Sequence, residues 1–247
     1  MLVDAHTHLD HFDQADWQTA RDEIERLPVK CWAVSTDIKS YQRTLELAGR
    51  SKQTLVTFGI HPWEAHLYAD RLELLEPWIE QSPHLGEIGL DFHWVKERER
   101  YALQHQVFTF FLERASRQQK IVNLHTKGAE SETADLLERH SIPKAVVHWY
   151  SGPLDPFQRL VAYGSFFTFG IELLYSEHIA QLAAETPLDQ MLTETDGPTA
   201  LAWLTDDREK SMPRHVQPVL NRVAEIKKMP VEACQTAIFS NWTKLFE

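Results

Sequence analysis

Eight short runs of hydrophobic and β-branched residues recur along the chain, and each run ends in a cluster of polar residues. Runs of this length and composition are typical of buried β-strands. They cover residues 2–6, 31–35, 55–61, 85–89, 121–125, 145–148, 166–170 and 191–196. Each interval between them suits one helix with its loops, so the pattern predicts a repeated β-α unit.

The segments between these runs carry apolar residues at helical spacing, with charged residues between them. Residues 97–120 and 214–228 are predicted helices, and residues 231–246 are predicted to form the last helix. Residues 72–79 show the same pattern, but Pro77 interrupts it. Eight β-α units in a chain of this length predict a (β/α)₈ TIM barrel. An open doubly wound sheet is the alternative, although the glycine-rich loop that usually follows its first strand is missing from the sequence.

Length and composition narrow the class of protein. The chain has 247 residues, which suits one domain over residues 1–247, and no linker interrupts it. Its two cysteines cannot form a disulfide framework, which favours a reducing compartment. No apolar run approaches the roughly 18 residues of a membrane span, and the first residues lack the apolar run of a signal peptide. We therefore expect a cytoplasmic protein without a membrane partner.

The formal net charge is −11, from 25 Lys and Arg against 36 Asp and Glu. This acidity argues against a passive nucleic-acid coat protein, which normally carries a basic face. An enzyme acting on nucleic acid stays open, because bound metal ions supply positive charge locally. Residues 208–228 carry six basic and two acidic residues, which predicts a local basic edge.

Histidines and carboxylates stand at the ends of the predicted strands. In a parallel barrel these ends share one face, where active sites are built. The predicted metal ligands are His6, His8, Glu87, His125, His148, Asp196 and Glu194. One ion needs only three or four such ligands, so the set predicts two divalent ions. Mixed nitrogen and oxygen ligands suit Zn²⁺, Mn²⁺ or Mg²⁺ and do not choose among them.

The sequence offers no other nucleophile than water. It has neither a Gly-x-Ser-x-Gly elbow nor a P-loop, and neither Cys31 nor Cys234 has a neighbouring histidine and acid. Most of the remaining histidines fit surface or packing positions. His61 ends the third run and His93 lies just beyond the fourth, where contact with a substrate is as plausible as packing.

A set of motifs runs in order along the whole chain. The motifs are Asp4-Ala5-His6-Thr7-His8-Leu9-Asp10, Gly59-Ile60-His61-Pro62, Gly86-Glu87-Ile88-Gly89-Leu90-Asp91, Leu124-His125, His148 with Ser151-Gly152, Glu194-Thr195-Asp196-Gly197-Pro198, and the closing Asn241-x-x-x-Leu245-Phe246. This set resembles the TatD-like metal-dependent deoxyribonucleases, which belong to the amidohydrolase-type barrel superfamily.

The resemblance implies a role for each predicted ligand. His6, His8, Glu87 and Asp196 would bind one ion, and Glu87 would bridge to a second ion held by His125 and His148. Glu194 matches a carboxylate that helps a third, weaker ion in some members.

The resemblance also implies the catalytic and substrate residues. Asp196 would act as general base to the attacking water, and Glu87 would be catalytic as the bridge between the ions. His61, His93 and Lys127 would lie near the substrate phosphate.

Around the predicted ligands the chain departs from the family pattern. Members commonly read His-Ser-Arg-Asp-Ala, Cys-Phe and aromatic-aromatic-Arg where this chain has His125-Thr126-Lys127-Gly128-Ala129, Trp149-Tyr150 and Phe92-His93-Trp94. Such variants resemble the TatD-like subgroup that accompanies the Qat anti-phage defence systems. That likeness implies protein partners of a defence complex.

The leading hypothesis is phosphodiester hydrolysis on DNA, starting from an end. Lys127 adds a point charge for a phosphate oxygen. Trp94, Trp149 and Tyr150 follow predicted strands and are candidates for stacking on an unpaired base, with packing at the barrel mouth as the alternative.

Two other functions remain open. One is a metallohydrolase of a small amide, lactone or phosphate ester, which would need the same metal ligands. The other is a non-catalytic, metal-stabilised subunit of a larger complex.

Overall fold

The computed structural model of the protein describes residues 1–205 and 209–247. Strands and helices alternate along the described chain, and all eight predicted strands are confirmed. The strands are β1 (Leu2–Thr7), β2 (Val29–Ala33), β3 (Thr54–Val56), β4 (Leu85–Gly89), β5 (Val122–His125), β6 (Ala145–Val147), β7 (Phe166–Phe169) and β8 (Met191–Thr193). The α-helices are α1 (Gln14–Arg26), α2 (Ile38–Ala48), α3 (Glu76–Gln81), α4 (Glu99–Gln118), α5 (Glu130–His140), α6 (Leu154–Tyr163), α7 (Glu177–Glu185), α8 (Ala200–Leu204), α9 (Val216–Ile226) and α10 (Val231–Phe246).

The contacts group the chain into two compact units. Unit 1 comprises Met1–Ala33, Glu46–Leu55 and Phe167–Glu247, and unit 2 comprises Val34–Leu45 and Val56–Phe166. The organisation of residues 1–247 as one domain stays a prediction. Among the described residues, no helix is both long and apolar enough to cross a membrane.

In unit 1, β1 pairs with β2 and β7 pairs with β8, both in parallel. Helix α10 packs against β1 and β8. Trp32 of β2 is fully buried, and its ring meets the rings of Trp242 and Phe246 at centroid distances of 6.4 and 5.3 Å. These edge-to-face contacts fix the last helix to the first strands.

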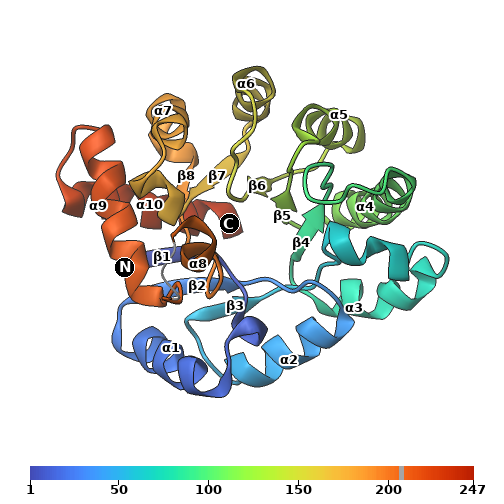
Figure 1. Cartoon of the computed structure of the whole chain (residues 1–247), viewed down its shortest axis with the longest axis horizontal. Helices are drawn as coiled ribbons and strands as arrows, with labels where there is room; N and C mark the ends of the chain where they lie inside the picture. Colours follow the sequence, from blue (N-terminus) through green and yellow to red (C-terminus); the bar gives the residue numbers. More distant parts are fainter. Residues whose placement is uncertain (206–208) are drawn as a thin grey trace. The chain divides into compact units, whose positions relative to one another are not determined.

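In unit 2, the strands β4, β5 and β6 pair in parallel in that order. Helices α4, α5 and α6 line one side of these three strands (Figure 1). The aromatic core joins Phe58 to Tyr41 and to Phe111 of α4, at centroid distances of 5.3 and 5.7 Å. Parallel pairing puts the carboxyl ends of the three strands at one edge, which is where the polar clusters of the sequence fall.

Three predicted strands have bounds that differ by two residues or more. Strand β8 ends at Thr193 instead of residue 196. Strand β2 begins at Val29, because Val29 pairs with Leu2 of β1, so Cys31 lies inside the strand. Strand β3 is shorter than residues 55–61. The amides of Phe58 and Gly59 donate to the hydroxyl oxygens of Ser82 and Ser35, at 2.9 and 3.2 Å, instead of extending a ladder.

The predicted helices are confirmed with two refinements. Pro77 does not interrupt a helix: a 3₁₀ turn, Leu72–Leu75, precedes α3, and Pro77 stands in the first turn of α3. Proline favours that position because the first helical amides have no partner in the helix. The predicted helix at 214–228 likewise starts with a 3₁₀ turn, Pro213–His215, before α9.

Candidate active site

Three side chains of unit 2 meet at one carboxylate oxygen. Glu87 lies on β4, His125 ends β5, and His148 follows β6. Nδ1 of His125 and Nε2 of His148 each lie 2.9 Å from Oε1 of Glu87. All three side chains are buried. The parallel strands thus bring together three of the predicted ligands, with nitrogen and oxygen donors aimed at a common point.

His61 joins this group from the loop after β3. Its Nε2 lies 3.3 Å from Nδ1 of His125 and 3.5 Å from Oε1 of Glu87. Its Nδ1 accepts a hydrogen bond of 3.2 Å from the amide of Trp63, so a neutral His61 carries its proton on Nε2. His61 thus lies beside two of the predicted ligands, and its contact with a substrate stays a prediction.

The buried carboxylate of Asp91 orients His125. Oδ2 of Asp91 lies 3.0 Å from Nε2 of His125, so the imidazole donates there and turns Nδ1 toward Glu87. A carboxylate behind a ligating histidine fixes its tautomer in this way in many metal sites. Sequence reasoning did not select Asp91, although it stands just beyond β4 within the Gly86–Asp91 motif.

Charges in this group shift two pKa values. Burial opposes ionisation of Asp91. The pKa of Asp91 is nevertheless held well below its usual range, because Asp91 bonds to His125 and feels its charge, and because it also accepts hydrogen bonds from the amide of Trp94 and the indole of Trp63. Burial likewise opposes protonation of His125, yet its bonds to Asp91 and Glu87 and their negative charges raise its pKa. The two acids and the imidazole therefore form a tightly coupled ionic group.

Glycines allow the close approach of the strands that carry these residues. A Cβ added to Gly89 would lie 1.9 Å from the carbonyl oxygen of His125, and φ at Gly89 is +148°. A Cβ added to Gly59 would lie 2.2 Å from the carbonyl oxygen of Glu87. Both positions exclude any side chain, so the glycines of the sequence motifs position Glu87 and His125.

Unit 1 assembles a second group from β1 and the chain after β8. Nε2 of His6 and Nε2 of His8 lie 3.3 Å apart. Oδ1 of Asp196 lies 3.8 Å from the first and 3.5 Å from the second. The amide of Asp196 donates to the carbonyl oxygen of His6 at 3.0 Å. Glu194, two residues earlier, is fully buried and accepts a hydrogen bond from Thr168.

The backbone at Asp196 is in the left-handed region, with φ of +44°. Non-glycine residues rarely adopt this conformation, which costs free energy and clusters at functional sites. The next residue must be small: a Cβ on Gly197 would lie 2.5 Å from the carbonyl oxygen of Ser211. The chain after β8 is thus held in a strained turn that aims Asp196 at the two histidines.

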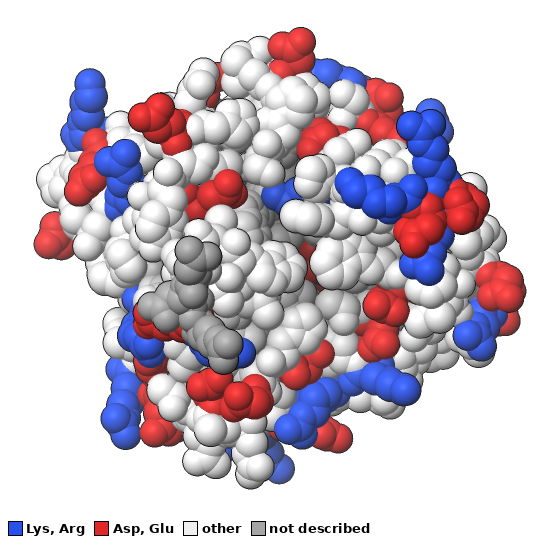
Figure 2. Space-filling view, viewed as in Figure 1, with Lys and Arg blue, Asp and Glu red and all other residues white. Residues whose placement is uncertain are grey.

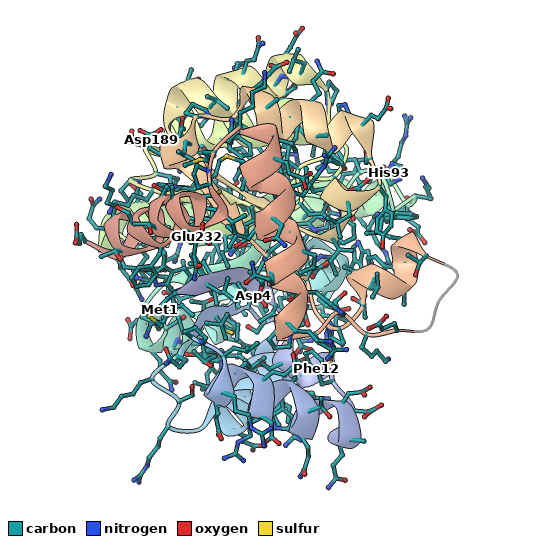
Figure 3. All side chains as sticks on the ribbon, turned by 90° about the vertical axis from the view of Figure 1, so that its left-hand side faces the viewer. Met1, Asp4, Phe12, His93, Asp189 and Glu232 are labelled. Atoms are coloured by element: carbon teal, nitrogen blue, oxygen red, sulfur yellow. The ribbon has the colours of Figure 1, made fainter. Side chains whose placement is uncertain are left out.

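Asp4 lies in strand β1 of unit 1, two residues before His6 (Figure 3). It is fully buried and accepts hydrogen bonds from the amide and the hydroxyl of Thr195, at 2.8 and 2.7 Å. Burial raises its pKa to about 7, while these hydrogen bonds lower it. The pair ties β1 to the turn that carries Asp196. Sequence reasoning missed this role, although both residues lie inside the quoted motifs.

The donor atoms of each unit fit divalent metal ions. In unit 2, ligand atoms of His61, Glu87 and His125 lie within 4.8 Å of one another. In unit 1 the same holds for His8, Asp10 and His11, a grouping that the sequence did not predict. Imidazole nitrogen with carboxylate oxygen is the donor chemistry of zinc and manganese enzymes. The ligand role of each residue stays a prediction.

The predicted substrate residues of unit 2 differ in exposure. His93 and Trp94 are exposed, and the side chain of Lys127 is half-buried, with Nζ donating to the carbonyl oxygen of Trp149 at 2.9 Å. Tyr150 is buried and packs against Phe157 at a centroid distance of 5.5 Å. Its ring is therefore not presented for stacking on a base, contrary to the prediction.

The predicted basic edge is neutralised in part within unit 1. Arg208 lies outside the described residues. Arg214 forms ion pairs with Glu23 and Glu209, at 2.6 and 3.3 Å, and Arg222 pairs with Glu225 at 3.0 Å. On the face shown in Figure 2, Lys and Arg side chains likewise stand among Asp and Glu side chains. The segment offers less unpaired positive charge than its composition suggested.

Comparison with known proteins decides the family. The family model described as TatD related DNase matches residues 3–247. The chain belongs to this family. An uncharacterized metal-dependent hydrolase of Haemophilus influenzae is 27% identical over 259 residues, covering 100% of this chain and 99% of the relative. The human deoxyribonuclease TATDN3 is 25% identical, covering 99% of this chain and 94% of the relative.

A solved structure supports the same assignment. The crystal structure of YjjV, a TatD homologue of Escherichia coli, has a TM-score of 0.87 at 25% identity and covers 99% of this chain and 97% of its own. The predicted (β/α)₈ barrel class is thereby confirmed, as is the predicted family. This TatD-family protein is an enzyme of the metal-dependent hydrolase type, acting on ester bonds.

Proposed function

We propose that this TatD-family hydrolase cleaves phosphodiester bonds of DNA from an end of the strand, using two divalent ions. The observation that carries the proposal is the convergence of His125 and His148 on one oxygen of Glu87, in a chain that matches the TatD related DNase model. The name of the human relative, a deoxyribonuclease, supports DNA as the substrate class.

The reaction needs a base, a nucleophile and charge compensation. Divalent ions, when bound, lower the pKa of the attacking water and neutralise charge on the phosphate. Asp196, held by the left-handed turn beside His8, takes a proton as the water oxygen bonds to phosphorus. The bond from phosphorus to the leaving oxygen breaks, and that oxygen takes a proton from solvent. The residues that would hold the ions are His6, His8, Glu87, His125, His148, Asp196 and Glu194.

Exposed and partly buried residues of unit 2 supply the substrate contacts of this proposal. Lys127 places an ammonium group for a phosphate oxygen, and its position is fixed by hydrogen bonds to Ser151 Oγ and to the carbonyl oxygen of Trp149, at 2.6 and 2.9 Å. Trp94 is 58% exposed and is available for stacking on an unpaired base. The partly buried Trp149 and the exposed His93 complete the contacts that we propose.

A nuclease assay tests the proposal. End-labelled single-stranded and double-stranded DNA are incubated with Mg²⁺, Mn²⁺ or Zn²⁺, beside a panel of small esters, lactones and amides, with His6→Ala as control. We expect labelled mononucleotides to appear with the wild type and not with the variant. Intact DNA at saturating metal, with turnover of a small ester, would instead identify a small-molecule metallohydrolase.

The cellular setting is part of the proposal. The altered residues after β4, β5 and β6 support membership of the subgroup associated with Qat anti-phage defence. We therefore propose protein partners in a defence complex and a cytoplasmic location. Purification of a tagged chain from its native host, followed by identification of bound proteins, tests the partners, and fractionation of the host cells tests the location.

A further inference from the structure

The indole of Trp63 is anchored beside the histidines of unit 2. Trp63 follows His61 and Pro62 in the 3₁₀ helix η2 (Pro62–Leu67), and 37% of its surface is exposed. Its Nε1 donates a hydrogen bond of 2.7 Å to Oδ2 of Asp91. Its ring meets the ring of His61 edge-on, with centroids 4.8 Å apart and planes at 83°. A large aromatic ring is thus both partly open to solvent and held in place.

The anchor of this ring is also the anchor of His125. The same oxygen of Asp91 that accepts the indole proton lies 3.0 Å from Nε2 of His125. The other oxygen accepts the amides of His93 and Trp94, at 2.9 and 2.7 Å. One buried carboxylate therefore sets the position of the indole, of a predicted metal ligand and of the exposed loop at 93–94.

Packing alone does not explain this arrangement. A tryptophan that only fills the core buries its ring, as Trp32 does with an exposed fraction of 0%. Trp63 leaves a third of its surface in water while its polar edge is tied to the site. An ordered, exposed ring binds a flat ligand at low entropic cost, because its rotamer is already fixed.

We propose that Trp63 is a second stacking contact beside Trp94, for the unpaired nucleobase next to the scissile phosphate, and that it favours single-stranded over double-stranded ends. The inference rests on the proposed deoxyribonuclease function and names a specificity residue within it. Each base offers a π-face to an aromatic ring regardless of sequence. A base inside a duplex is already stacked and paired, so it gains less from the indole than an unpaired base.

Kinetics with base-deleted DNA test the proposal. The substrates are one single-stranded oligonucleotide, its duplex, and single-stranded versions with one abasic site at the first or second nucleotide of either end. The variants are Trp63→Ala, Trp63→Phe and the control Leu74→Ala, an exposed apolar residue of the 3₁₀ turn Leu72–Leu75. Thermal unfolding with and without Mn²⁺ confirms that each variant is folded and binds metal.

We expect Trp63→Ala to lower kcat/KM on the intact single strand by about 5- to 150-fold, mainly through KM, the range for loss of one stacked base. Trp63→Phe keeps a π-face and should lose less, and Leu74→Ala should match the wild type. On the substrate that lacks the stacked base, Trp63→Ala and the wild type should differ by less than about twofold. The preference for the single strand over the duplex should fall in Trp63→Ala.

The contrary outcomes are distinct. If Trp63→Ala loses as much on every abasic substrate as on the intact strand, the ring only positions Asp91, and the stacking role is wrong. If Trp63→Ala equals the wild type on all substrates, Trp63 does not contact the base. Under both outcomes, cleavage of the intact strand by the wild type would still support the deoxyribonuclease function. A wild type that cleaves none of these DNAs overturns the proposed function and the stacking role together.

Discussion

Replacing Glu87 with glutamine should remove most of the stabilisation that metal gives this protein. Glu87 is 2% exposed, and its Oε1 lies 2.9 Å from both the His125 and the His148 nitrogens. Glutamine keeps the size of the side chain but not its negative charge. It therefore cannot neutralise the charge of a divalent ion that His125 and His148 would bind. The predicted defect is therefore in metal affinity.

The size of the expected change in Tm follows from the linkage between metal binding and folding. A metal at about 100 times its dissociation constant stabilises the folded state by roughly 2.7 kcal/mol. For a chain of this size each kcal/mol raises Tm by about 2–4 °C, so the wild type should gain about 5–11 °C. If the substitution weakens binding about 100-fold, the same metal concentration gives only about 0.4 kcal/mol, or about 1–2 °C.

Calorimetric unfolding of EDTA-treated protein, titrated with Mn²⁺ at constant pH, measures this difference. Glu73→Gln, which neutralises an exposed carboxylate on the 3₁₀ turn Leu72–Leu75, is the matched control and should behave as the wild type. A full metal-induced rise in Tm for Glu87→Gln would refute the reasoning, because the convergence of two imidazoles on Glu87 would then have no part in metal binding.

Three further predictions concern stability. Thr195→Val removes the hydroxyl that donates to buried Asp4 and should cost about 1–3 kcal/mol in urea unfolding, whereas Thr195→Ser should cost less; equal losses would contradict this. Burial lowers the pKa of His84 to about 4, below its usual 6.5, so the unfolded state takes up the proton first and stability should fall as pH drops from 6.5 to 4. Because solvent partly screens His84, we expect the free energy of unfolding to fall by roughly 1–2 kcal/mol over this pH range. His84→Gln should reduce this dependence of stability on pH, as denaturant unfolding at a series of pH values would show. Gly89→Ala would put a methyl carbon 1.9 Å from the carbonyl oxygen of His125 and should leave little folded protein, as circular dichroism would report.

The secondary structure could be predicted from the sequence because it rests on local pattern. Helix α10 has the predicted bounds, Val231–Phe246, since apolar positions at helical spacing and Pro230 before the first turn define it. Strand β3 could not be bounded in this way. It ends at Val56 because hydroxyl groups of Ser35 and Ser82, distant in sequence, take the amides of Phe58 and Gly59.

The candidate site, too, could be predicted only in part from local sequence pattern. The residue types at the strand ends could be predicted, because strand periodicity and motif spacing select His6, His8 and Glu87 without any tertiary contact. The sequence could not show that one oxygen of Asp91 binds both His125 and Trp63, nor that Tyr150 is buried.

Those facts depend on side-chain direction and on packing between segments far apart in the chain, and only the tertiary structure decides them. The physical reason is the high free-energy cost of burying a carboxylate without hydrogen-bond donors. Asp91 is stable as an anion only when donors from several loops converge on it, and no local pattern records that convergence.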